Sequence, residues 1–104
     1  MNNIFIGSEF KLNVSIEPIS DFTMDDYDFK CEFWCYSNRK VTIEKKDMSR
    51  QDENNYIARL DSRLLGSGEL KCMVTAYIPD SDFDDGYRTE VVCVDTNCDI
   101  VKSL

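Results

Sequence analysis

The residues most suited to chemistry lie in one short acidic stretch, residues 80–86, where aspartates alternate with other residues. Alternating carboxylates followed by a glycine are typical of the start of a calcium-binding loop. Here Asp85 occupies the position of the required glycine, Gly86 comes one residue late, and Val91 stands where a bidentate glutamate is expected. The stretch therefore predicts a solvated acidic hairpin tip without a resident metal, with weak calcium binding as the alternative. Its candidate contact residues are Asp80, Asp82, Phe83, Asp84 and Asp85.

Catalysis has little to build on, because the chain contains no histidine. Nucleophilic machineries of the Ser–His and Cys–His types are therefore excluded. A carboxylate pair can cleave glycosides, but the acidic residues fall on polar strand faces or in loops, where burial would not raise the pKa to that of a general acid. No glycine-rich phosphate loop is present. We expect a protein that is not an enzyme, with no catalytic residues and no cofactor.

The five cysteines indicate packing more than chemistry. Cys31, Cys72 and Cys93 fall in strand-like stretches, where cysteine commonly behaves as a small buried apolar residue. Cys31 and Cys35 are four residues apart on one strand, about 13 Å, which is too far for a mutual disulfide or a shared metal. With no C-x-x-C pair, a structural zinc site is disfavoured. We expect free thiols, with Cys31 and Cys72 facing each other across the core as a thiol pair or, if oxidised, a bridge.

Three aromatic residues point away from the expected core. Trp34 and Tyr36 are out of register with the apolar face of their strand, and Tyr77 is out of register on its own strand. Outward aromatic side chains are frequent partner contacts, because they bury a large area at low entropic cost. The alternatives are that loops or the N-terminal segment cover them, or that the strand is buried on both faces. We predict Trp34, Tyr36 and Tyr77 as contact residues together with the acidic tip.

The elements that must position these residues are β-strands. Residues 69–78 alternate strictly between apolar and polar, Pro79 ends the ladder, and a second strand begins at Tyr87 with the apolar run 91–94. Further strands are predicted at 4–6, 9–17, 27–36, 40–45, 56–60 and 97–102, with a turn at 37–39, a loop at 46–55 and one helical turn at 61–66, capped by Asp61 and closed by Gly66.

These elements predict a single all-β domain of 104 residues, an immunoglobulin-like antiparallel β-sandwich of about seven strands. If consecutive strands run antiparallel, the loops at 18–26, 46–55 and 79–86 gather at one pole. They hold half of the twenty carboxylates of the chain. These are Asp21, Asp25, Asp26, Asp47, Asp52, Glu53, Asp80, Asp82, Asp84 and Asp85.

The net charge of −8 restricts the partners. A surface this acidic repels a phosphate backbone, so we expect no binding to nucleic acid and a preference for basic protein surfaces. No apolar run approaches the roughly 20 residues that cross a bilayer, and residues 1–7 lack the positive charge and apolar core of a signal peptide. We therefore expect a soluble protein of the cytosol without a membrane partner.

Two stretches carry a resemblance to a known family. The first is residues 9–18 (EFKLNVSIEP) followed by 24–29 (MDDYDF), and the second is residues 75–80 (TAYIPD) followed by 82–83 (DF) and 85–91 (DGYRTEV). With 55–58 (NYIA) between them, they resemble small Ig-like virion structural proteins of Bacteroidales (crAss-like) tailed phages and prophages.

This resemblance implies a non-enzymatic virion component, either an auxiliary or decoration protein of the head or a tail or baseplate piece. Such a protein binds other capsid or tail proteins, can form a homo-oligomer, and is assembled in the host bacterial cytoplasm. The competing interpretation is a cellular or exported Ig-like binding or adhesion module, with weak calcium binding at an acidic loop.

Overall fold

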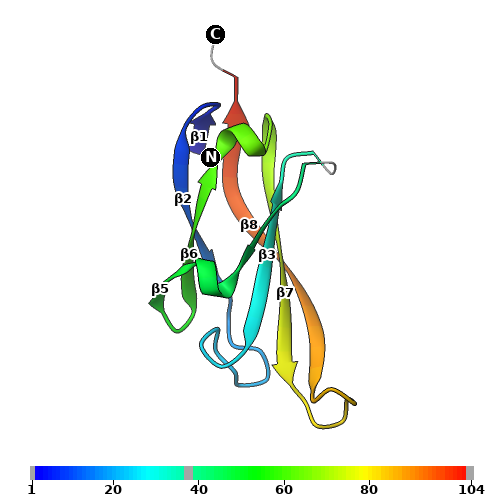
Figure 1. Ribbon diagram of the computed structural model, residues 1–104. Helices are drawn as coiled ribbons and strands as arrows, with labels where there is room; N and C mark the ends of the chain where they lie inside the picture. The colour runs from blue at the N-terminus through cyan, green and yellow to red at the C-terminus, as the bar shows by residue number, and fades with distance from the viewer. Residues whose placement is uncertain (1, 37–38, 103–104) are drawn as a thin grey trace.

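The computed structural model describes residues 2–36 and 39–102, in which nearly all regular structure is β (Figure 1). The body is elongated, with extents of 53 × 28 × 21 Å, and the two longest strands run along most of its length. The elements are β1 (Asn2–Phe5), β2 (Glu9–Ser15), β3 (Asp28–Trp34), β4 (Val41–Glu44), η1 (Lys45–Asp47), β5 (Ser49–Asp52), β6 (Asn55–Asp61), η2 (Ser62–Leu64), β7 (Gly68–Pro79) and β8 (Tyr87–Val101).

The strands form two sheets that pack face to face. One sheet has the order β1-β8-β7-β3-β4 and the other the order β2-β6-β5. The orders β4-β3-β7-β8 and β2-β6-β5 correspond to the C′-C-F-G and B-E-D sheets of immunoglobulin domains. The predicted all-β sandwich is therefore confirmed. One strand pair departs from the antiparallel rule, because β1 pairs with β8 in parallel.

The core lies between the sheets because apolar residues alternate along the strands that face each other. On β3 the side chains of Phe29 and Phe33 are fully buried, and the ring of Tyr56 from the opposite sheet lies 5.3 Å from that of Phe29, edge to face. Each buried side chain of this size contributes about 1.5–3 kcal/mol. The predicted inner row of β7 is buried throughout: Leu70, Cys72, Val74, Ala76 and Ile78.

The predicted loop at 46–55 is wrong in its centre, because β5 forms there. Every residue of β5 is exposed, so no apolar alternation marks it in the sequence. It exists as an edge strand that pairs through its backbone with β6, opposite Ile57 and Tyr56. The carboxylate of Asp52 accepts the Asn54 N–H at 2.9 Å and shapes the turn into β6.

The separate strand predicted at 97–102 is also wrong, because β8 continues through it. Two extra residues of β8 are accommodated between the pairs Glu69–Asp99 and Lys71–Asp95, and Asn97 has a positive φ of 53° there. This bulge bends the strand without ending it. The helical turn is confirmed: Asp61 accepts the Arg63 N–H at 3.0 Å. Part of the predicted turn at 37–39 lies outside the described residues.

The short helical turn also anchors the N-terminal strand. Ser62 is fully buried, and its hydroxyl accepts the Gly7 N–H at 2.9 Å and donates to the carbonyl of Phe5 at 3.3 Å. The Ser62 N–H in turn donates to the carbonyl of Ser8 at 3.0 Å. β1 is thus held against the sandwich from two sides, by β8 and by Ser62.

Candidate functional site

The three loops predicted to share one pole do meet there. The Met24 N–H donates to the carbonyl of Glu53 at 2.9 Å, which joins the loop after β2 to the turn after β5. Arg88 donates to the hydroxyl of Ser20 at 2.7 Å, which joins the same loop to the β7–β8 hairpin. That hairpin extends further than the other loops at this end of the molecule (Figure 1).

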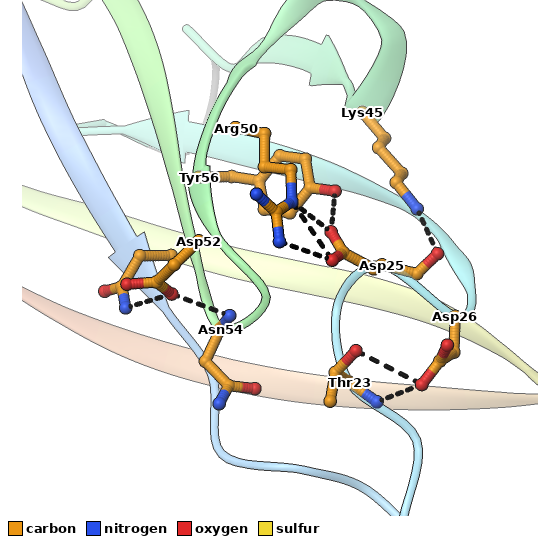
Figure 2. Close-up of polar contacts among 9 residues, drawn as sticks. Thr23, Asp25, Asp26, Lys45, Arg50, Asp52, Asn54 and Tyr56 are labelled. Atoms are coloured by element: carbon orange, nitrogen blue, oxygen red, sulfur yellow. Dashed lines mark hydrogen bonds and ion pairs between the residues drawn. The ribbon is translucent and has the colours of Figure 1, made fainter.

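Asp25 is the best-connected carboxylate of the pole (Figure 2). Arg50 donates to it from Nε and Nη2 at 2.9–3.0 Å, and the hydroxyl of Tyr56 donates at 2.6 Å. These bonds, that of Arg50 above all, lower the pKa of Asp25 to about 2. Lys45 donates to the backbone carbonyls of Asp25 and Tyr27 at 3.3 and 2.8 Å. This carboxylate therefore fixes the loop after β2 onto β5 and β6.

Other carboxylates of the pole shape backbone turns. Asp26 accepts the N–H and the hydroxyl of Thr23 at 2.8 and 3.1 Å (Figure 2). Asp52 accepts from the side-chain amide of Asn55 at 2.7 Å, which is the main reason that the pKa of Asp52 is lowered. By accepting backbone N–H groups of their own turns, these carboxylates stabilise the loop conformations.

Two of the four aspartates of the hairpin tip, Asp80 and Asp85, are arranged in the same way. Asp80 accepts the Asp82 N–H and a bond from Arg88, both at 3.0 Å, and these two contacts lower its pKa, the backbone bond most. Asp85 accepts the Tyr87 N–H at 3.1 Å. These two carboxylates thus bond within their own hairpin. Phe83, at the tip, is 50 % exposed.

A hollow of about 410 Å³ lies beside this tip, on the outer face of the larger sheet. Its acidic residues, Asp26, Asp28 and Asp85, form no ion pair with any cation among residues 2–36 and 39–102. Tyr77 pairs across strands with Asp28 and is half-buried, and Tyr87 is 52 % exposed. The lining is completed by Tyr27 and Pro79. Two carboxylates of this hollow, Asp26 and Asp28, and the tyrosine Tyr87 were not among the predicted contact residues.

The predicted contact residues fall into two groups instead of one. Tyr77 and the tip residues lie at the acidic pole, whereas Trp34 ends β3, about 20 Å along the strand from Asp28. Trp34 is half-buried, with the ammonium of Lys40 4.9 Å from its ring centroid. Tyr36 follows it and is 53 % exposed. Trp34 and Tyr77 do share the outer face of one sheet, because both alternate with the buried rows of β3 and β7.

The predicted pairing of Cys31 and Cys72 across the core is wrong in its geometry. They lie on adjacent strands of one sheet, since Cys31 pairs with Val74 and Cys72 with Phe33. Their mutual hydrogen bond and burial raise the pKa of the Cys72 thiol. All five cysteines are free thiols. A buried thiol of raised pKa is a poor nucleophile, so this pair serves packing.

Among the described residues, no three His, Cys, Asp or Glu side chains are grouped so that they could hold a metal ion. The same part of the chain contains no helix with the length and apolar character of a membrane span. We compared the chain with protein-family models, curated proteins and solved structures, and none of these comparisons found a match.

Proposed function

We propose that this protein is a non-enzymatic structural component of a tailed-phage virion, an auxiliary protein of the head or a piece of the tail or baseplate. The observation that carries this proposal is the acidic hollow beside the projecting β7–β8 hairpin. A rigid sandwich that presents charge and aromatic rings at one end suits attachment to a neighbouring protein. The virion setting comes from the sequence resemblance described above.

The chemistry of the hollow favours a basic partner. The carboxylates of Asp26, Asp28 and Asp85 each accept a backbone N–H through one oxygen, which leaves the other oxygen for a ligand. Carboxylates without a counter-ion next to the rings of Tyr77 and Tyr87 suit a lysine or arginine side chain, which combines ion pairing with cation–π contact. The partner in this proposal is a virion protein with an exposed basic segment.

The state of the cysteines supports assembly inside a cell. Five unpaired thiols in a small β-sandwich fit a reducing compartment better than an exported one, where disulfides form. Titration of thiols after unfolding measures this directly. Five reactive thiols agree with the proposal, and two disulfides would favour export and contradict it.

The decisive experiment is mass spectrometry of virions purified from the source. We expect this chain among the virion proteins, and its absence from intact particles would overturn the assignment. Binding to the particle then tests the hollow: Asp28→Asn and Asp85→Asn should weaken attachment, whereas Glu69→Gln, an equal change of charge at the other end of β7, should not. Equal weakening by all three variants would point to net charge instead of the hollow.

A second candidate function, an adhesion module with weak calcium binding, rests on Asp82 and Asp84. These two exposed aspartates of the tip form no ion pair within the described ranges. Isothermal titration with calcium separates the two candidates. Heat that saturates in the millimolar range and disappears in the double variant Asp82→Asn/Asp84→Asn would favour the module, and no heat would remove its calcium binding.

A further inference from the structure

β8 has one edge that is only partly covered. β7 pairs with one side of β8 along nearly its whole length, from Tyr87 to Ile100. β1 pairs with the other side only from Cys98 to Val101. Within residues 2–36 and 39–102, no other strand neighbours this edge. The N-terminal two thirds of β8 therefore present an open edge.

The phase of the ladder identifies the groups that face outward. The Asp80 N–H donates to the carbonyl of Gly86 at 2.8 Å, which makes these two residues a hydrogen-bonded pair of the hairpin. Hydrogen-bonded and non-bonded pairs alternate along an antiparallel ladder, so the even-numbered residues of β8 bond to β7 up to the bulge. Pro79, which lacks an N–H, falls at a non-bonded position as this phase requires. The residues whose backbone groups face the open edge are Thr89, Val91, Cys93 and Asp95.

Both ends of this open segment are already closed by side chains. Asp85 accepts the Tyr87 N–H at 3.1 Å, and Asp95 accepts the Asn97 N–H at 3.0 Å. Beyond Asn97, β1 takes over the edge. The unsatisfied backbone groups are thus confined to one stretch that is centred on Val92.

This stretch lacks the usual protection of an edge strand. Natural edges carry charges, prolines or bulges that prevent pairing with another chain. Residues 91–94 read Val-Val-Cys-Val, with no charge and no proline, and the side chain of Val91 is 57 % exposed. A strand-forming apolar run on an open edge is a template for a further strand.

We propose that a second copy of this chain pairs with this edge, β8 against β8, antiparallel and related by a two-fold axis at Val92. In this register Val91 lies opposite Cys93 of the other copy, and Thr89 lies opposite Asp95. All four residues that face the open edge then find partners at once, because each open segment meets an identical segment of the same length and phase. The two five-stranded sheets become one continuous sheet across the axis.

The charges on β8 agree with this register. Arg88 lies opposite Thr96 of the other copy, and Glu90 lies opposite Val94, so no like charges face each other directly. The remaining opposition is the net charge of −8 on each copy, which acts over a distance that salt screens. We therefore expect the dimer to strengthen as ionic strength rises.

The test is sedimentation velocity of the full chain over a series of concentrations, with Val91→Pro as the variant. Proline at 91 removes an N–H that faces the open edge and leaves the bonds to β7 intact, because Val91 occupies a non-bonded pair. We expect dimers of the parent chain and monomers of Val91→Pro. The matched control Val91→Thr keeps the N–H and the β-branched shape, and it should still dimerise. A parent chain that stays monomeric at millimolar concentration, or a Val91→Pro variant that dimerises equally, overturns the proposal.

A cross-link keeps the proposal testable if Val91→Pro fails to fold. In Val91→Cys the new thiol lies opposite Cys93 of the second copy, within the reach of a disulfide. Oxidised glutathione should convert this variant into a covalent dimer: for each disulfide formed, one glutathione disulfide is reduced to two glutathione thiols, which take up the two protons. Adding Cys93→Ser should abolish the cross-link. Failure of Val91→Cys to cross-link would contradict the pairing. These experiments use the purified chain alone, so their outcome is independent of whether the protein belongs to a virion.

Discussion

Two groups of carboxylates lie at the same end of the sandwich and differ in what surrounds them. Asp25 is held by Arg50 and Tyr56 and fixes one loop onto the smaller sheet. Asp28 and Asp85, beside the hairpin, accept backbone N–H groups but have no cationic partner in the part of the chain that the structure describes. The same acidic composition therefore includes two kinds of carboxylate: neutralised ones that stabilise the fold, and unneutralised ones at which the proposed basic partner would bind.

The largest loss in the free energy of unfolding should follow from truncation of Tyr56, which bonds to Asp25. Tyr56→Ala removes a buried ring that packs on Phe29 and a hydroxyl that bonds to Asp25, so we expect a loss of about 3–5 kcal/mol in the free energy of unfolding. Tyr56→Phe removes the hydroxyl alone and should cost about 1.5–3 kcal/mol, because the lost bond is to an ionised carboxylate. Urea denaturation measures both. Equal losses would mean that the hydroxyl, and not the ring, dominates.

The next largest effect should be on the pH dependence of stability, where Asp25 should differ from the carboxylates of the hollow. The pKa of Asp25 is about 2 in the folded protein, whereas an unperturbed aspartate, as in the unfolded chain, has a pKa of 3.8. The folded state therefore favours the ionised form of this carboxylate. Its contribution is present above about pH 4 and disappears as the pH falls toward 2. Asp25→Asn should lower the melting temperature at pH 7 and flatten its fall between pH 4 and 2. An unchanged acid limb in this variant would show that other carboxylates cause the fall.

Neutralising the hollow should affect stability least. In Asp28→Asn the side-chain oxygen can still accept the Phe29 N–H, so we expect a change within about 0.5 kcal/mol in the free energy of unfolding. Thermal denaturation beside the parent chain measures it. A loss as large as that of Tyr56→Phe would mean that Asp28 also stabilises the fold, and the distinction between the two groups would fail.

The cysteines also divide into exposed and buried groups, and their reactivity should show the difference. Cys93 is exposed, whereas Cys31 and Cys72 are buried and the pKa of Cys72 is raised. A thiol reagent applied to the native protein should label Cys93 first and leave the other two until unfolding. Peptide mapping after brief labelling locates the adduct, and early modification of Cys72 would contradict the packing described here.

The sequence predicts those parts of the fold in which the alternation of apolar and polar residues matches the alternation of buried and exposed positions. Residues 69–78 alternate because one face of β7 is buried, and the shared pole follows from antiparallel order alone. β5 was missed because it is polar on both faces and forms through backbone pairing. The ion pair of Asp25 with Arg50 joins distant segments and depends on the register of β5 against β6, which no local pattern records. The hollow was only partly predicted for the same reason, because three segments build it.

The contact of Ser62 with the N-terminal segment helps to hold β1 over one end of the β8 edge. Its hydroxyl and the β8 ladder together keep β1 on residues Cys98–Val101. Loss of the hydroxyl would remove its two bonds and leave the Ser62 N–H bond to Ser8 and the ladder with β8, so β1 would be held less firmly over the C-terminal end of β8. In the proposed dimer, a single buried serine would thus limit the length of edge that the second copy can use.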